Sequence, residues 1–195
     1  MNDFSFSEST CDTYSFSVFN GYVSEGLAET LKRFNGKKLC PVIVCVGSDL
    51  VLGDSLGPLI GTMLKDKGVK SYVYGTLNFP ITAKEVTYAG NYLKLTHPDC
   101  FYIAVDAAVG SDDDVGLIKT FNKGLKPGLG VDKRLGTIGD CSIIGVVAEK
   151  SLQNYSLFNL TRLNLVYKMA EKIAEGIGSY IYEMCLTFKE DAVGA

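Results

Sequence analysis

PVIVCVGSDLVLGDSLGPLIG, residues 41–61, contains the pattern that decides the fold. Its first part, 41–47, is apolar on both faces, which is typical of a central strand covered by helices. The strand breaks at Gly47 and Ser48, and apolar residues at helical spacing then predict a helix over 55–67. A buried strand that leads directly into a helix indicates an α/β protein with a largely parallel sheet.

The rest of the chain repeats this alternation of strands and helices. Apolar or alternating runs predict strands at 71–74, 101–107, 116–121 and 141–148, and helical spacing predicts helices at 22–34, 82–95 and 155–186. Residues 1–20 are rich in Ser and Phe and are predicted to be a mobile N-terminal tail, with an edge strand as the alternative. Residues 21–195 are predicted to form a single domain.

Composition and charge disfavour several classes of protein. The 195 residues carry a formal net charge of −3 with acids and bases interspersed, which argues against nucleic acid as a partner. No apolar run approaches about 18 residues, so no membrane span is predicted. Lys32 is the first basic residue, so the N-terminus also lacks the positive region of a secretory signal. The sequence therefore predicts a soluble cytoplasmic protein.

Six cysteines and one histidine are present without any C-x-x-C pair, so a structural zinc site is not expected. The cysteines are predicted to be reduced thiols, because disulfide frameworks are typical of small secreted chains. His97 precedes a proline at a predicted helix end, which favours a surface or capping role. Asp112–Asp114 lack the spacing of an EF-hand and predict a solvated turn.

Two acids follow the buried strands and are the candidate functional residues. Asp54 lies between the strand at 41–47 and its helix, and Asp106 is predicted to end the strand FYIAVD. Ligands of parallel sheets bind beyond the carboxyl ends of the strands. If the two strands are neighbours, both carboxylates enter one crevice, where one keeps a proton and the pair can activate water. The same pair could instead hold a divalent metal ion.

Each acid also has a structural alternative. Asp54 could be the N-cap of the helix that it precedes. Asp106 follows apolar residues and needs partners to offset its desolvation, which loop amides could supply. The glycines around Asp54 do not form a P-loop, because the Gly-Lys-Ser/Thr ending is absent.

Five separated blocks of the chain resemble the YyaC-type sporulation proteins of spore-forming Firmicutes. They are VCVGSDLVLGDSLGPLIG, VYGTLNFPITA, FYIAVDAAVG, LKPGLGVDKRLGTIGDCSIIGVV and LFNLTRLNLVYKMA, and they occur in this order over most of the chain. The resemblance implies kinship with the germination protease of bacterial spores and, more distantly, with hydrogenase maturation proteases. It also implies a three-layer α/β/α sandwich with a mixed, largely parallel sheet of the phosphorylase/hydrolase-like kind.

The resemblance further implies that Asp54 and Asp106 are the catalytic aspartates and that the KPGLGV loop lies near the same cleft. Hydrogenase maturation proteases bind nickel through a later histidine, which this chain lacks after His97, so no cofactor is expected. The residues expected to contact substrate are Gly47, Ser48, Asp49, Ser55, Lys126, Gly128, Gly130 and Asp140.

The favoured function is a sporulation-associated aspartic-type endopeptidase that acts on a peptide or spore protein in the sporulating cell or forespore. One alternative is a non-catalytic sporulation factor that binds a peptide or protein partner. Another is a metal-assisted hydrolase that adds Asp49 or Asp140 to the acid pair. Association of the chain with copies of itself is a separate expectation about its partners.

Overall fold

A six-stranded mixed sheet forms the centre of the computed structural model, which describes residues 12–36, 40–126, 137–150 and 161–193. The strands are β1 (Thr13–Ser17), β2 (Pro41–Cys45), β3 (Tyr72–Tyr74), β4 (Phe101–Gly110), β5 (Leu117–Phe121) and β6 (Cys141–Glu149). The helices are α1 (Val23–Asn35), α2 (Leu56–Asp66), α3 (Val86–Thr96) and α4 (Leu163–Val193), with short 3-10 helices η1 (Leu52–Ser55) and η2 (Asp112–Asp114).

The strand order is β1-β5-β6-β4-β2-β3, and it explains why the sheet is mixed. The four strands β3, β2, β4 and β6 are parallel to one another, as predicted for a largely parallel sheet. Strands β1 and β5 add antiparallel pairs at one side of the sheet. Strands β2 and β4 are therefore neighbours, as the acid-pair hypothesis requires.

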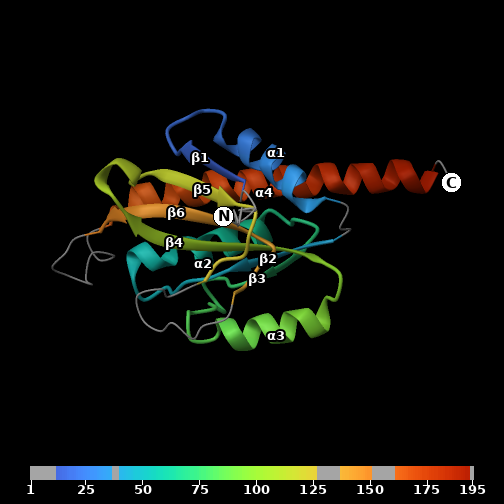
Figure 1. Cartoon of the computed structure of the whole chain (residues 1–195), viewed down its shortest axis with the longest axis horizontal. Coiled ribbons are helices and arrows are strands. Elements are labelled where there is room, and N and C mark those ends of the chain that lie inside the picture. The colour runs from blue at the N-terminus through green and yellow to red at the C-terminus, as the bar shows by residue number, and fades with distance from the viewer. Residues whose placement is uncertain (1–11, 37–39, 127–136, 151–160, 194–195) are drawn as a thin grey trace, which may run out of the picture.

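Helices cover both faces of the sheet, so the prediction of an α/β/α sandwich is confirmed (Figure 1). The larger core lies between one face and helices α1, α2 and α4, with side chains such as Ile43, Val105 and Ile143 facing the helices. On the other face, Val86 and Leu93 of α3 pack over the second apolar cluster. The far half of α4 projects beyond the sheet in Figure 1.

The structure corrects the predicted boundary of the N-terminal tail. Residues Thr13–Ser17 form the edge strand β1, antiparallel to β5, so the predicted tail over 1–20 is wrong for this part. The alternation of Tyr14 and Phe16 with polar residues is the signal for this strand, since both side chains pack against the larger core. Residues 1–11 lie outside the described residues.

His97 is at a helix end as predicted, but it is buried rather than exposed. It is the C-cap residue of α3, and its backbone N–H donates to the carbonyl of Leu93. The Tyr74 hydroxyl lies 2.6 Å from His97 Nε2, and the Tyr72 ring lies 4.1 Å from the imidazole between centroids. These two tyrosines of β3 cover the imidazole, which the sequence pattern did not indicate.

The remaining predictions on cysteines, acids and membrane spans agree with the described structure. Cys40, Cys45, Cys100, Cys141 and Cys185 are free thiols, and Cys11 lies outside the described residues. The Asp112–Asp114 segment is the short turn η2. Within the described ranges, each helix is too short or too polar to cross a membrane.

Candidate active site

Two glycines fold the loop after β2 back onto the end of that strand. Gly47 has φ of 145°, and a Cβ atom there would lie 2.1 Å from the Asp54 carbonyl oxygen. At Gly57, in the first turn of α2, a Cβ atom would lie 2.0 Å from the Val46 carbonyl oxygen. Such approaches are possible only without a side chain. The loop therefore holds η1, and with it Asp54, against the carboxyl end of β2.

Strand β4 continues past the point where β2 ends, and this corrects the position predicted for Asp106. Cys45, the last residue of β2, pairs with Val105, whereas β4 runs on to Gly110 beside β6. Asp106 is therefore inside the strand, opposite Ile144 of β6, rather than at its end. On the other side β2 has already turned away, and η1 packs against β4 in its place.

The carboxyl groups of Asp54 and Asp106 interact electrostatically. Burial raises the pKa of Asp106 to about 8, the Ala107 amide at 2.8 Å from Oδ1 lowers it, and the charge of Asp54 raises it. Burial also raises the pKa of Asp54, which the Ser48 amide partly offsets. A negative charge on Asp54 disfavours a second negative charge on Asp106, so it adds to the effect of burial. The two carboxyl groups are therefore close enough for the charge of Asp54 to act on Asp106.

The capping alternative for Asp54 is not supported. The N-cap residue of α2 is Ser55, and no side chain donates or accepts a capping hydrogen bond there. Asp54 instead lies inside η1, where its backbone N–H donates to the Val51 carbonyl oxygen at 3.0 Å. Its carboxyl group is therefore not used to begin the helix.

The loop residues predicted to contact substrate differ in their positions. Ser48 is partly exposed, and its backbone N–H donates to the Asp54 carbonyl oxygen at 3.0 Å. Asp49 is fully on the surface of the same turn. Ser55 is buried, and its hydroxyl donates to the Leu52 carbonyl oxygen at 2.7 Å, which gives this residue a local structural role. Gly47 and Ser48 thus lie beside Asp54, and Asp49 lies on the exposed surface of the same turn.

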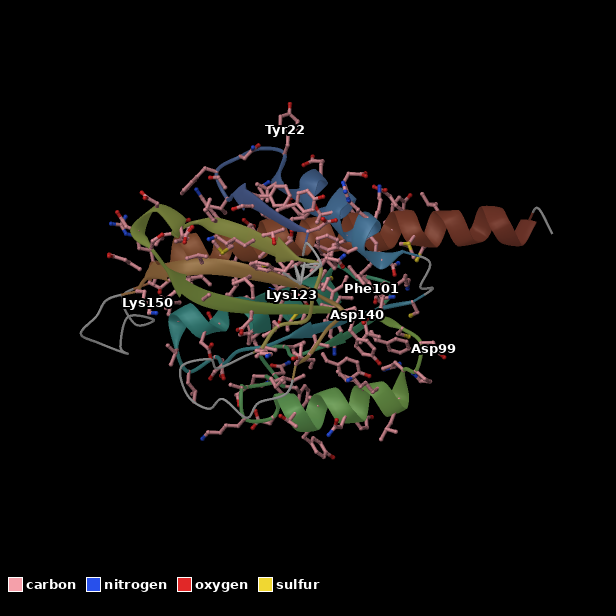
Figure 2. All side chains as sticks on the ribbon, viewed as in Figure 1. Tyr22, Asp99, Phe101, Lys123, Asp140 and Lys150 are labelled. Atoms are coloured by element: carbon pink, nitrogen blue, oxygen red, sulfur yellow. The ribbon has the colours of Figure 1, made fainter. Side chains whose placement is uncertain are left out.

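Asp140 was predicted at the same cleft, and the structure places it at the other end of β4. Its carboxylate accepts a hydrogen bond of 2.9 Å from the Tyr102 backbone N–H. Tyr102 precedes Asp106 by four residues of the strand, about 13 Å at the usual rise. Figure 2 shows Asp140 beside Phe101, far from Lys150, whose N–H bonds to Gly110 at the carboxyl end. The sequence could not reveal this position. Asp140 comes just before β6, and no local pattern records that β6 begins beside the first part of β4, away from Asp106.

The glycine-rich loop is only partly described. Leu125 pairs with Ile138 at the beginning of β6, and Lys126 next to it is exposed. Gly128 and Gly130 lie outside the described residues. The approach of this loop to the acid pair stays a prediction.

Comparison with known proteins identifies the family. A family model described as "Protein of unknown function (DUF1256)" matches residues 18–176. The chain belongs to this DUF1256 family. A Bacillus subtilis (strain 168) member, "Uncharacterized protein YyaC", is 41% identical over 152 residues, which cover 77% of this chain and 73% of that protein. The family match thus spans both Asp54 and Asp106.

A solved structure resembles this DUF1256 fold. It is the [NiFe] hydrogenase maturation protease HycI from Thermococcus kodakarensis KOD1, with a TM-score of 0.55 at 20% sequence identity. The similarity covers 78% of this chain and 99% of the other. At this identity the likeness establishes the shared fold, not the chemistry of the site.

The residues that the structure describes test whether the acid pair has further metal ligands. Across the described ranges, no three His, Cys, Asp or Glu side chains are grouped so that they could hold a metal. Asp140 lies beside Tyr102, too far along β4 to join the acid pair as a ligand. The metal-assisted alternative therefore has no support from the described part of this DUF1256 protein.

Sequence analysis missed two residues that shape the site. Gly57 allows η1 to approach β2, and the Ala107 amide donates to the Asp106 carboxyl group. A glycine within the first turn of a helix was the available signal for close contact with the backbone. No sequence signal marks Ala107, because any residue except proline offers the same N–H.

The pH dependence of stability tests the protonation of Asp106. Its pKa is about 8 in the folded protein and about 4 when unfolded, so only the folded form keeps this proton between those values. The free energy of unfolding should thus fall as pH rises from 5 to 8, by at most about 1.4 kcal/mol per pH unit and less with solvent screening. Urea titrations at several pH values measure this slope.

Asp106→Asn should flatten that slope, because Asn has no proton to lose. Asp49→Asn, on the surface of the neighbouring turn, is the matched control and should keep it. Equal slopes in the wild type and Asp106→Asn would show that Asp106 ionises normally in the folded protein.

Proposed function

We propose that this protein is a sporulation-associated aspartic-type endopeptidase that cleaves a spore protein at the Asp54–Asp106 pair. The observation that carries the proposal is that burial and the charge of Asp54 raise the pKa of Asp106 to about 8. One ionised and one protonated carboxyl group in a single site are what acid–base hydrolysis of a peptide bond requires. The resemblance to sporulation and germination proteins supports the setting and the kind of substrate.

The two carboxyl groups have different roles in the proposed reaction. Asp54 is the base, since its negative charge is one of the causes that keep Asp106 protonated, and it takes a proton from the attacking water. Asp106 is the acid, and it donates its proton to the peptide carbonyl oxygen as water attacks, which gives a gem-diol. Asp54 then passes the proton it took from water to the leaving amine, and Asp106 regains a proton from the gem-diol as the C–N bond breaks. The Ala107 amide orients the Asp106 carboxyl group by donating to Oδ1 at 2.8 Å.

The position of the pair supports access by an extended substrate. Asp54 and Asp106 are each only partly buried, and beyond the end of β2 the short helix η1 lies against β4. Ser48 is partly exposed next to Asp54. We propose that the backbone around Gly47 and Ser48 contacts the peptide near the scissile bond.

The proposal is tested by incubating the purified full-length protein with an extract of spore proteins. Mass spectrometry of new N-termini should detect cleavage products that the double variant Asp54→Asn/Asp106→Asn does not generate. Cleavage should persist in EDTA, because the mechanism uses no metal ion. Loss of cleavage in EDTA would instead establish a metal-assisted hydrolase.

The absence of new N-termini from any extract, with folded protein, would contradict the peptidase proposal. In that case, retention of a spore protein by the wild type, and its loss on altering Ser48, would establish a binding factor on the same fold.

A further inference from the structure

Three partly exposed cysteines occur at the end of the sheet opposite the acid pair. Cys40 immediately precedes β2, Cys100 immediately precedes β4, and Cys185 lies in α4. All three are free thiols, and they differ from Cys45 and Cys141, which are fully buried in the larger core. Asp99 and Phe101, which flank Cys100, are labelled in Figure 2 near the side where α4 projects.

The strand register brings Cys40 and Cys100 opposite each other. Pro41 pairs with Phe101 in the parallel β2–β4 ladder, and the Phe101 N–H donates to the Cys40 carbonyl oxygen at 2.9 Å. Cys40 comes directly before Pro41, and Cys100 comes directly before Phe101. Neighbouring strands lie about 4.8 Å apart, and disulfides join Cα atoms about 4.4–6.8 Å apart. The backbone spacing therefore permits a bond without a large movement.

The two side chains also lie on the same face. Cys100 packs against the cluster under α3. Cys40 shares that face, since side chains alternate along a strand and Val42, two residues on, belongs to the same cluster. Burial raises the pKa of the Cys40 thiol, and the neighbouring Cys100 thiol raises it further through charge and a hydrogen bond. The Cys100 thiol is therefore near enough to act on Cys40, and the Cys185 thiol also raises the Cys40 pKa through its charge.

We propose that Cys40 and Cys100 form a redox modification site, a dithiol that a low-molecular-weight disulfide converts into a protein disulfide. One cysteine thiolate attacks the small disulfide, which forms a mixed disulfide and releases one small thiol. The second thiolate then attacks the protein sulfur of that mixed disulfide and releases the other small thiol. Two electrons pass to the small disulfide, and the two thiol protons leave with its products.

The bond joins the beginnings of β2 and β4, the two strands whose other ends carry the acid pair. It closes a loop from residue 40 to residue 100, which restricts the unfolded chain and so stabilises the folded one. Asp106 lies six residues beyond Cys100 along β4, so the modification is independent of the proposed peptidase activity.

The experiment exposes the full-length wild-type protein to excess oxidised glutathione, followed by acid quench, alkylation and peptide mapping. The main product should have lost about 2 Da, the mass of two hydrogen atoms, with a Cys40–Cys100 cross-link. Cys45 and Cys141 should remain unmodified, because they are buried. The oxidised form should melt several degrees higher, and dithiothreitol should reverse both changes.

Two variants distinguish a bond between Cys40 and Cys100 from a bond that involves Cys185. Cys185→Ser should still form the cross-link, whereas Cys100→Ser should stop at a mixed disulfide on Cys40. A cross-link from Cys40 to Cys185 or Cys11, or mixed disulfides on both Cys40 and Cys100 without a bond between them, would overturn the proposal. The wild-type map alone decides this if a variant does not fold.

Discussion

Asp106→Asn is expected to reduce peptide hydrolysis by about 10²–10⁴-fold, the usual contribution of a general acid or base. The raised pKa of about 8 keeps Asp106 protonated near neutral pH, so in the proposed reaction it can donate that proton to the peptide carbonyl oxygen. Asn matches the shape of the side chain but has no acidic proton. The loss should appear in kcat measured on a peptide that contains the mapped cleavage site.

The wild-type rate should also depend on pH in a predictable direction. It should fall as pH rises above about 8, because Asp106 then loses the proton that the reaction needs. Asp49→Asn should leave both the rate and the pH profile unchanged, since Asp49 lies on the exposed surface of its turn. An Asp106→Asn variant that keeps the wild-type rate would rule out this residue as the acid.

Gly57→Ala is expected to lower the free energy of unfolding by about 3 kcal/mol or more. The new Cβ atom would lie 2.0 Å from the Val46 carbonyl oxygen and 2.8 Å from its carbon, so backbone atoms must move. For a chain of this size the melting temperature should fall by about 6–12 °C. Chemical and thermal denaturation measure both effects.

Gly178→Ala in α4 is the matched control. Its nearest neighbour would be Val69 Cγ2 at 3.8 Å, an ordinary contact, so the substitution meets no obstacle. It should stabilise the protein by about 0.5–1 kcal/mol, because alanine favours a helix interior over glycine. A Gly57→Ala variant as stable as Gly178→Ala would mean that α2 does not lie as close to β2 as the structure indicates.

The apolar runs determined most of the fold. PVIVC and FYIAVDAAVG are apolar because their strands are covered on both faces, and this property can be recognised without knowing which elements cover them. The helical spacing of α4 is equally local, since its buried residues recur on one face. The sequence also predicted Asp54 and Asp106, because acids after buried strands of a parallel sheet share one edge.

The positions that sequence reasoning placed wrongly depend on contacts between distant segments. Asp140 lies beside Tyr102 because β6 begins level with the first part of β4, a register that no local pattern records. His97 is buried because Tyr72 and Tyr74 of β3 cover it.

The acid pair itself shows where sequence stops and tertiary structure begins. The sequence provides two carboxyl groups and the glycines around them. The order of the sheet makes β2 and β4 neighbours, and the early end of β2 leaves space for η1 against β4. Burial in that space raises the pKa of Asp106, and it arises from the packing of segments far apart in the chain. The sequence by itself therefore predicted these two acids as a candidate pair, and only the tertiary structure decided their neighbours and how burial raises the pKa of each.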